Sequence, residues 1–174
     1  MKKLFSFVLL LAAVLTTTVL ASCDGDNNDN ASSFSGTYTG TDSLKFGMGT
    51  VSYKTAAGNV QFVVTMNSDG SINITLPREA FDFSAAVPMV GKIVQGGYTI
   101  KNIPYDSTRK AYYLDYSNKA SANVSISGMN LSKEYTVTFG QITVTFTGST
   151  MTVVNVHKFG NMPMKLAATF IGTK

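Results

Sequence analysis

The strongest constraint on the fold of this chain is an alternation of apolar and polar residues with a period of two. Val60, Phe62 and Val64 share one parity, and the polar Gln61 and Thr65 have the other. Successive side chains of a β-strand point to opposite faces of a sheet, so the alternation predicts strands with one buried and one solvated face. Because the pattern recurs through most of the chain after residue 34, the sequence predicts an all-β protein.

Turn-forming residues separate the alternating segments. Residues 67–70, Asn-Ser-Asp-Gly, lie between two of them, and an Asp-Gly pair in that position is typical of a β-hairpin. The parity changes at Gly140-Gln141, which predicts a bulge or a tight turn there. No window supports an amphipathic helix longer than about two turns, although residues 78–87 could hold a short one. We expect strands at residues 36–46, 60–66, 72–76, 93–103, 111–116, 121–127, 135–139, 142–146, 151–158 and 164–171.

These segments give about eight to ten short antiparallel strands, for which two architectures are open. One is a closed up-and-down β-barrel, and the other is a two-sheet β-sandwich. Both give each strand one apolar and one polar face, so the alternation alone does not choose between them. In a barrel, the inward side chains should include Phe62, Val64, Ile72, Ile74, Val124, Ile126, Val137, Phe139, Val144 and Phe146.

Composition excludes several kinds of site and partner. The chain has one Cys, one His and no Trp among its 174 residues. A single Cys cannot form an internal disulfide framework or a multi-cysteine zinc or iron–sulfur site. After the first 22 residues, the Lys and Arg residues are scattered singly apart from Arg109-Lys110, with no basic stripe interleaved with aromatic residues. The sequence therefore predicts no nucleic-acid partner.

The first 22 residues have the pattern of a secretory signal peptide. Lys2 and Lys3 precede an apolar run over residues 4–15, and residues 20–23 (Leu-Ala-Ser-Cys) end a segment of small side chains. A membrane-spanning helix is the rival interpretation, because the apolar stretch approaches the roughly 20 residues that cross a bilayer. Three consecutive Thr residues at 16–18 and the abrupt end at Cys23 favour the signal peptide over residues 1–22.

The Leu-Ala-Ser-Cys ending also resembles a bacterial lipobox, in which the Cys is acylated and becomes the first residue of the mature protein. The resemblance implies that Cys23 is lipidated and that the protein is held at a membrane through it. Residues 24–33 contain three Asp and no large apolar side chain, so residues 23–33 are expected to form a lipidated Cys and a flexible acidic tether. An acidic stretch here resembles the export signal of some Gram-negative lipoproteins. It implies an outer-membrane lipoprotein exposed at the cell surface, with simple linker composition as the alternative.

Three short segments together carry a family resemblance. They are Phe34-Ser35-Gly36-Thr37-Tyr38-Thr39-Gly40, the turn at 67–70 with the strand that follows, and Phe81-Asp82-Phe83. They look like the calycin-like β-barrel domain of many small bacterial lipoproteins. The resemblance covers about residues 34–173 and implies an up-and-down barrel domain, related to lipocalins, over residues 34–174. Tyr38 stands where lipocalins have the Trp of a Gly-X-Trp motif, and Lys165 is the candidate for the basic side chain with which lipocalins close that end.

The residues that could support catalysis are few. His157 is the only ordinary general base near neutral pH, and its place in an expected strand predicts a position at a barrel rim or on the surface. Cys23 is committed to lipid, and no nucleophile-elbow sequence nominates a serine. The sequence therefore predicts a non-enzymatic protein without a cofactor or metal site. The carboxylates considered, Asp82, Asp106, Asp115 and Glu134, stand isolated in the sequence.

Two functions remain open. The barrel could be a binding module for a small apolar or glycan-like ligand, or it could be filled and serve as a structural or protein-interaction component of the envelope. Haem binding through His157 with Met162 or Met164 is a sharper alternative, although Met is also an ordinary gap-filler. A continuous cavity above about 300 Å³ would favour a ligand. The aromatic residues that could line a cavity or a rim are Tyr98, Tyr112, Tyr113, Tyr116 and Tyr135.

Lipidation of Cys23 can be tested on membrane-extracted protein. The intact mass should correspond to a chain that begins at Cys23 and carries acyl chains. Cys23→Ala should release the protein from the membrane fraction, because the lipid is the only hydrophobic anchor expected after signal removal. The matched change Ser32→Ala in the tether should leave fractionation unaltered, and an unmodified chain that starts elsewhere would contradict the prediction.

Overall fold

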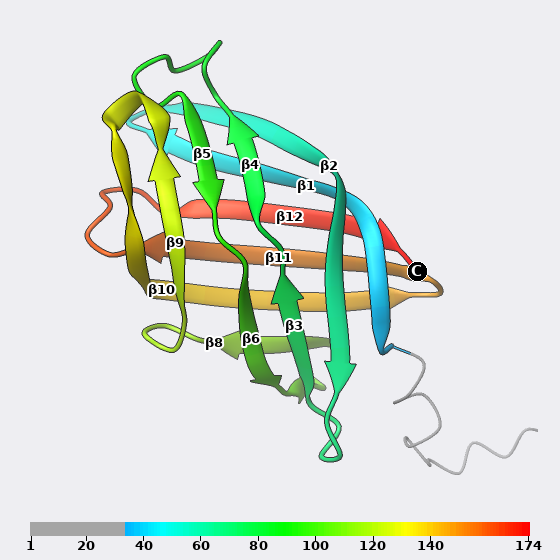
Figure 1. Ribbon diagram of the computed structural model, residues 1–174. Coiled ribbons are helices and arrows are strands. Elements are labelled where there is room, and N and C mark those ends of the chain that lie inside the picture. Colours follow the sequence, from blue (N-terminus) through cyan, green and yellow to red (C-terminus); the bar gives the residue numbers. More distant parts are fainter. Residues whose placement is uncertain (1–33) are drawn as a thin grey trace, which may run out of the picture.

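A computed structural model of the protein describes residues 34–174, in which twelve β-strands form one antiparallel sheet (Figure 1). The predicted signal peptide, Cys23 and the tether lie outside the described residues. Within residues 34–174, no helix is long and apolar enough to cross a membrane. The elements are β1 (Gly36–Met48), β2 (Val51–Met66), β3 (Ile72–Leu76), β4 (Glu79–Asp82), β5 (Lys92–Gln95), β6 (Tyr98–Ile103), β7 (Tyr105–Asp106), β8 (Ala111–Asp115), β9 (Ser121–Ile126), a 3-10 turn η1 (Ser127–Met129), β10 (Leu131–Thr147), β11 (Thr150–Phe159) and β12 (Leu166–Thr173).

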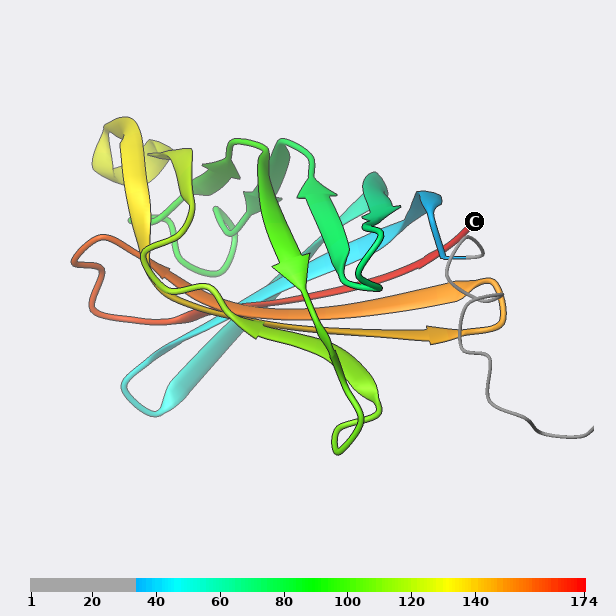
Figure 2. The ribbon, with the colours of Figure 1, turned by 90° about the horizontal axis from the view of Figure 1, so that it is seen from below.

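The strands are joined in the order β4-β5-β9-β10-β11-β12-β1-β2-β3-β6, and β8 pairs with the second half of β10. Most neighbours are consecutive in the chain, as in an up-and-down barrel, and β12 returns to pair with β1. Figure 2 shows that the sheet curls over itself, so that β3 to β6 and β9 lie across from β1, β11 and β12. Apolar side chains fill the space enclosed by the curl. The predicted all-β, antiparallel, barrel-like fold is therefore confirmed.

A bulge bends the long hairpin of β1 and β2. Between the residue pairs Gly40–Val60 and Asp42–Ala57, β2 has two unpaired residues, Gly58 and Asn59, where β1 has only one. Asn59 adopts a φ of 56°. Such an insertion increases local twist and lets a strand turn from one layer into another. At the same place β1 lies very close to its other neighbour, β12: a Cβ atom on Gly40 would lie 2.0 Å from the carbonyl oxygen of Ile171. Only glycine fits at that position.

A second bulge bends β10, for which the sequence predicts two separate strands. Its first half pairs with β9 and its second half with β11 and β8. The register shifts between Val137 and Phe139, two residues before the predicted break at Gly140-Gln141. The prediction that Phe139 points inward is therefore wrong, because an extra residue transfers the following side chains to the other face. Phe139 lies on the outside, with the Lys165 ammonium 3.5 Å from the centre of its ring.

Other strand boundaries differ from the predicted ones for local reasons. Residues 78–87 contain β4 and turns instead of a short helix, and Gly96-Gly97 divide the expected strand 93–103 into β5 and β6. Strand β2 begins at Val51, well before the predicted residue 60, because its first part extends beyond the core. Most side chains there are exposed or half-buried on both faces, so no apolar alternation marks this part as a strand.

The core contains eight of the ten residues predicted to point inward. The exceptions are Phe139 and Phe146, and Phe146 is a half-buried residue at one end of the barrel that stacks on Phe34 with ring centroids 4.4 Å apart. Inside the barrel, Phe62 stacks on Phe170 at 4.1 Å. The predicted turn at 67–70 is confirmed: Gly70 has a φ of 80°, a conformation that favours glycine. The eight confirmed core residues are Phe62, Val64, Ile72, Ile74, Val124, Ile126, Val137 and Val144.

Two phenylalanine truncations test these assignments. Phe62→Ala should lower the free energy of unfolding by about 3–5 kcal/mol, because it leaves a cavity in a filled core. Phe139→Ala should cost about 1 kcal/mol, because its ring covers part of the outer surface. Urea denaturation of both variants and the parent measures the difference, and equal losses would place Phe139 in the core after all.

Candidate functional site

A groove of about 790 Å³ opens at the end of the barrel where β10 separates from β11. Strand β11 pairs with β10 only from Val137 onward, whereas residues 131–136 pair with β9 alone. The edge of this part of β10 that would face β11 therefore has no strand partner, and a gap opens beside it. The turn between β1 and β2 and the loop at 160–164 complete the walls. We call this hollow the rim groove; its lining is Gly47, Gly49, Ile126, Met129, Leu131, Lys133, Tyr135, Gly160, Asn161, Met162, Pro163 and Met164.

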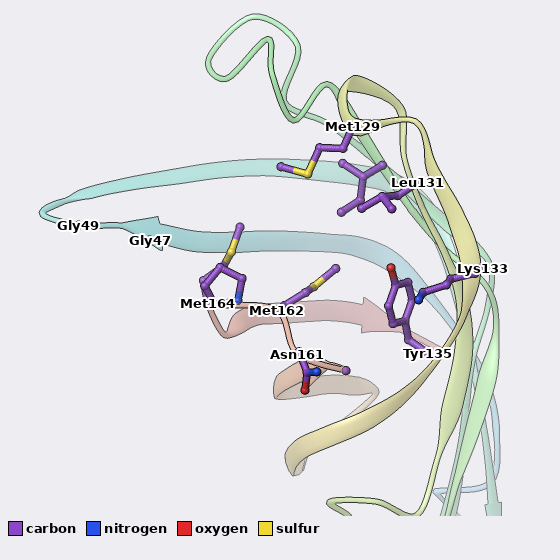
Figure 3. Close-up of a pocket in the computed structure, with 12 residues that line it drawn as sticks. Gly47, Gly49, Met129, Leu131, Lys133, Tyr135, Asn161, Met162 and Met164 are labelled. Atoms are coloured by element: carbon purple, nitrogen blue, oxygen red, sulfur yellow. The ribbon is translucent and has the colours of Figure 1, made fainter.

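Flexible apolar side chains face one another across the rim groove. Figure 3 shows Met129 and Leu131 on one side and Met162 and Met164 on the other. Met129 is 42% exposed and Leu131 is 38% exposed, values that are high for large apolar residues. Methionine is unbranched and polarizable, so such a surface adapts to ligands of different shape. The arrangement can bury an apolar molecule.

One positive charge accompanies this apolar surface. Lys133 is the single charged residue in the lining of the groove, and its ammonium lies 4.8 Å from the ring centre of Tyr135. The groove ends at the filled core: Phe46 and Phe159, each next to a glycine of the lining, are buried. A ligand would therefore occupy the mouth of the barrel, with the Lys133 ammonium beside it.

The barrel interior contains a hydrogen-bonded polar cluster. The Tyr116 hydroxyl donates to Asn155 Oδ1 at 2.6 Å, and Asn155 Nδ2 donates to the Tyr98 hydroxyl at 3.0 Å. Burial raises the pKa of Tyr98 to about 12 and that of Tyr116 further still, so both phenols remain protonated. All three side chains are buried. With the hydrogen bonds made, this cluster fixes the packing of β6, β11 and the segment after β8.

His157 lies in the same interior, which corrects its predicted place at a rim or on the surface. It is 1% exposed, and its Nε2 lies 3.0 Å from Gln95 Oε1. An amide oxygen can only accept, so Nε2 carries the proton. Burial lowers the pKa of His157 to about 4, which keeps the imidazole neutral at pH 7. In this setting His157 is a structural hydrogen-bond donor.

A pair of buried carboxyls was not anticipated from the sequence. Asp42 on β1 is 1% exposed, Glu79 on β4 is 7% exposed, and their side chains are hydrogen-bonded to each other. Burial is the largest cause that raises the pKa of both, and the Asp42 charge raises that of Glu79 further. Thirty-odd residues separate the two in the chain. The available signal was parity, because Asp42 shares the inward face of Leu44 and Phe46.

The other predicted site residues fall into different environments. Met162 and Met164 line the rim groove while His157 binds Gln95 in the core, so the structure does not assemble the haem ligands considered. Of the five tyrosines, Tyr135 lines the groove, and Tyr113 lies on the surface under the Arg109 guanidinium, 4.2 Å away. Within residues 34–174, no group of three or more His, Cys, Asp or Glu side chains could hold a metal ion.

The basic side chain at the Gly36 end of the barrel also differs from the predicted one. Lys165 lies outside on Phe139 and does not close that end. Lys174 does so instead, since its ammonium donates to the backbone carbonyl of Ser35 at 2.7 Å. The Lys174 stem packs over Gly36, and the φ of 147° at Gly36, a conformation that L side chains rarely adopt, explains a glycine there.

Comparisons with known proteins agree with this architecture. A family model described as the calycin-like β-barrel domain matches residues 34–173. No curated protein matches. A crystal structure of a candidate outer-membrane protein from Bacteroides fragilis is similar, with a TM-score of 0.53 and 21% sequence identity. The match covers 83% of this chain and 52% of the other, so this chain spans about half the length of that protein. At this identity the likeness concerns the fold.

The state of His157 predicts how stability depends on pH. Its pKa is about 4 when folded against an ordinary 6.5, so the unfolded chain binds a proton more readily. The contribution to stability is complete above about pH 6.5 and is lost as the pH falls toward 4, by up to about 3 kcal/mol. His157→Phe should remove this loss, so the stability gap between parent and variant should shrink on acidification. Denaturant unfolding at about pH 7 and pH 4 measures the gap; a constant gap would show that His157 titrates alike in both states.

Proposed function

Because this chain belongs to the family of calycin-like β-barrel domains, we propose that it is a non-enzymatic binding module of the cell envelope. Its ligand is a small molecule with an apolar body, held in the rim groove. The observation that carries the proposal is the groove itself, which combines a volume of about 790 Å³ with an exposed methionine-rich lining. Ligand sites of about 300–1,000 Å³ accept molecules of that class.

The charge in the groove favours a ligand with an anionic end. The apolar body would lie between the side chains of Met129 and Leu131 and those of Met162 and Met164. A carboxylate or phosphate would then accept a hydrogen bond from Lys133, the one charged side chain in the lining. Few polar side chains accompany it, which favours such an amphiphile over a glycan.

The position of the groove agrees with a membrane anchor at Cys23. The described chain begins at Phe34, which packs on Phe146 at the end of the barrel near the turn between β10 and β11. The rim groove lies at the other end (Figure 1). A barrel tethered through a lipidated Cys23 would thus present its groove away from the membrane. The candidate outer-membrane protein with a similar fold supports the outer membrane as its place, with outward exposure as part of the proposal.

The alternative is a structural or interaction component of the envelope. The filled interior supports this alternative, because aromatic side chains such as Phe62 and Phe170 stack there. Space for a ligand remains only at the mouth of the barrel. An exposed apolar rim can bind another protein as well as a small molecule. The binding experiment below separates the two functions.

Binding can be measured with a defined probe, a fluorescent fatty acid of medium chain length. The purified barrel should bind it reversibly, and Lys133→Glu should weaken binding about tenfold by replacing an attractive charge with a repulsive one. Met162→Asp should abolish it, because a carboxylate would then stand in the apolar wall. The matched control Lys110→Glu, outside the groove, should leave affinity unchanged.

Two outcomes would contradict the proposal. An affinity that is the same in all variants would place the probe elsewhere. If neither fatty acids nor other small amphiphiles bind or shift the melting temperature, the interaction component is the better account.

A further inference from the structure

A second hollow lies in the wall of the barrel, away from the rim groove. Strand β4 pairs with β5 along one edge, and its other edge faces β2, with which it shares no hydrogen-bonded register among the described strands. A cleft of about 350 Å³ occupies this seam between residues 57–61 and 77–80. We call it the seam cleft. Glu79 is part of its lining, so the buried carboxyl pair lies beside a path to solvent.

The carboxyl pair is not fully satisfied by the protein. Asp42 accepts hydrogen bonds from the backbone N–H groups of Ser43 and Thr169 in addition to its bond with Glu79. Asp42 Oδ1 and Glu79 Oε1 are nevertheless buried, and neither atom has a hydrogen-bond partner within residues 34–174. A buried unpaired carboxylate oxygen costs free energy, and native proteins rarely leave one without a compensating group. Two carboxyl groups side by side in a low-dielectric site share a proton, and both can ionise only if a positive charge lies beside them. The protein supplies none: Arg78, the basic residue of the cleft lining, is exposed and does not act on the pKa of either carboxyl.

We infer that the Asp42–Glu79 pair binds one hard divalent cation, of the Ca²⁺ or Mg²⁺ class, at the inner end of the seam cleft. This inference is independent of the rim groove and its ligand. On binding, the ion takes the place of the proton shared by the two carboxyls, and the proton leaves to solvent. The double negative charge of the pair is then neutralised by the double positive charge of the ion.

The donor set agrees with that class of ion. Carboxylate oxygens are the ligands that Ca²⁺ and Mg²⁺ prefer, whereas thiolates and imidazoles suit the softer transition metals. The β2 bulge at Gly58-Asn59 lies on the wall of the same cleft. A bulged residue is left out of the hydrogen-bond ladder, so its main-chain groups are not all used in strand pairing. Two carboxylates with further carbonyl and water ligands form a weak site, of the kind that extracellular modules use at about 0.1–1 mM Ca²⁺.

Occupancy should also affect the barrel itself. A cation held by Asp42 and Glu79 links β1 to β4, two strands that are not neighbours in the sheet. It would therefore connect the free edge of β4 to strand β1 in the opposite layer. In the described sheet, no backbone pairing with β2 holds that edge of β4. Ion binding is then expected to raise the melting temperature, because it favours the folded state alone.

The test compares melting temperatures at constant ionic strength after removal of divalent ions with a chelator. CaCl₂ and MgCl₂ are added separately, and at least one should raise the melting temperature of the parent in the millimolar range, the stronger of the two identifying the ion. The double variant Asp42→Asn with Glu79→Gln keeps the shapes but removes both charges, and it should lose the shift. The control Glu134→Gln removes an exposed carboxylate and should keep it.

Isothermal titration calorimetry of the parent protein tests ion binding without relying on a variant, which matters if the double variant fails to fold. It should give one ion per chain with proton release, measured as a dependence of the heat on the buffer. No heat and no melting shift with either salt would overturn the inference, and so would a shift that the double variant retains. Failure here leaves fatty-acid binding in the rim groove unaffected, because no residue is shared between the two sites.

Discussion

Each β-strand offers two hydrogen-bonding edges, and in this barrel the long strands change neighbours where a bulge bends them. Strand β10 pairs with β9 up to Thr136, with β11 from Val137 and with β8 from Gln141, and its register shifts between Val137 and Phe139. Strands β1 and β2 bend together at Gly58-Asn59. These bends let one sheet curl around a core, and they also leave edges without a partner. The rim groove and the seam cleft both lie at such unpaired edges.

The interior of the barrel contains several buried polar side chains among its apolar ones. Tyr98, Tyr116 and Asn155 satisfy one another, and His157 is satisfied by Gln95. Networks of this kind stabilise a unique packing once every member has its partner. The carboxyl pair contrasts with them, because an oxygen on each side chain has no protein partner. That contrast within one core supports the proposed cation at the Asp42–Glu79 pair.

In the proposed function, the rim groove separates stability from binding. Filled aromatic packing holds the barrel together below the groove, so the methionines at the mouth can adapt to a ligand without loss of the core. Lys133 would orient the proposed amphiphile, because its anionic end would face the wall that carries this ammonium. The sequence leaves open a hollow barrel and a filled one. In the structure, the interior is filled by side chains, and the mouth is open as the rim groove.

The sequence by itself determined the strand class, the turn at 67–70 and most of the core, because side-chain alternation is a local property of an extended chain. It did not locate the bulge at Thr138, so Phe139 was assigned to the wrong face. A bulge depends on the pairing strand, which local alternation does not identify. The Asp42–Glu79 pair and the rim groove were decided by tertiary structure alone, because they join residues from distant strands. His157 moved from a predicted rim to the core for the same reason: its partner Gln95 lies 62 residues away in the chain.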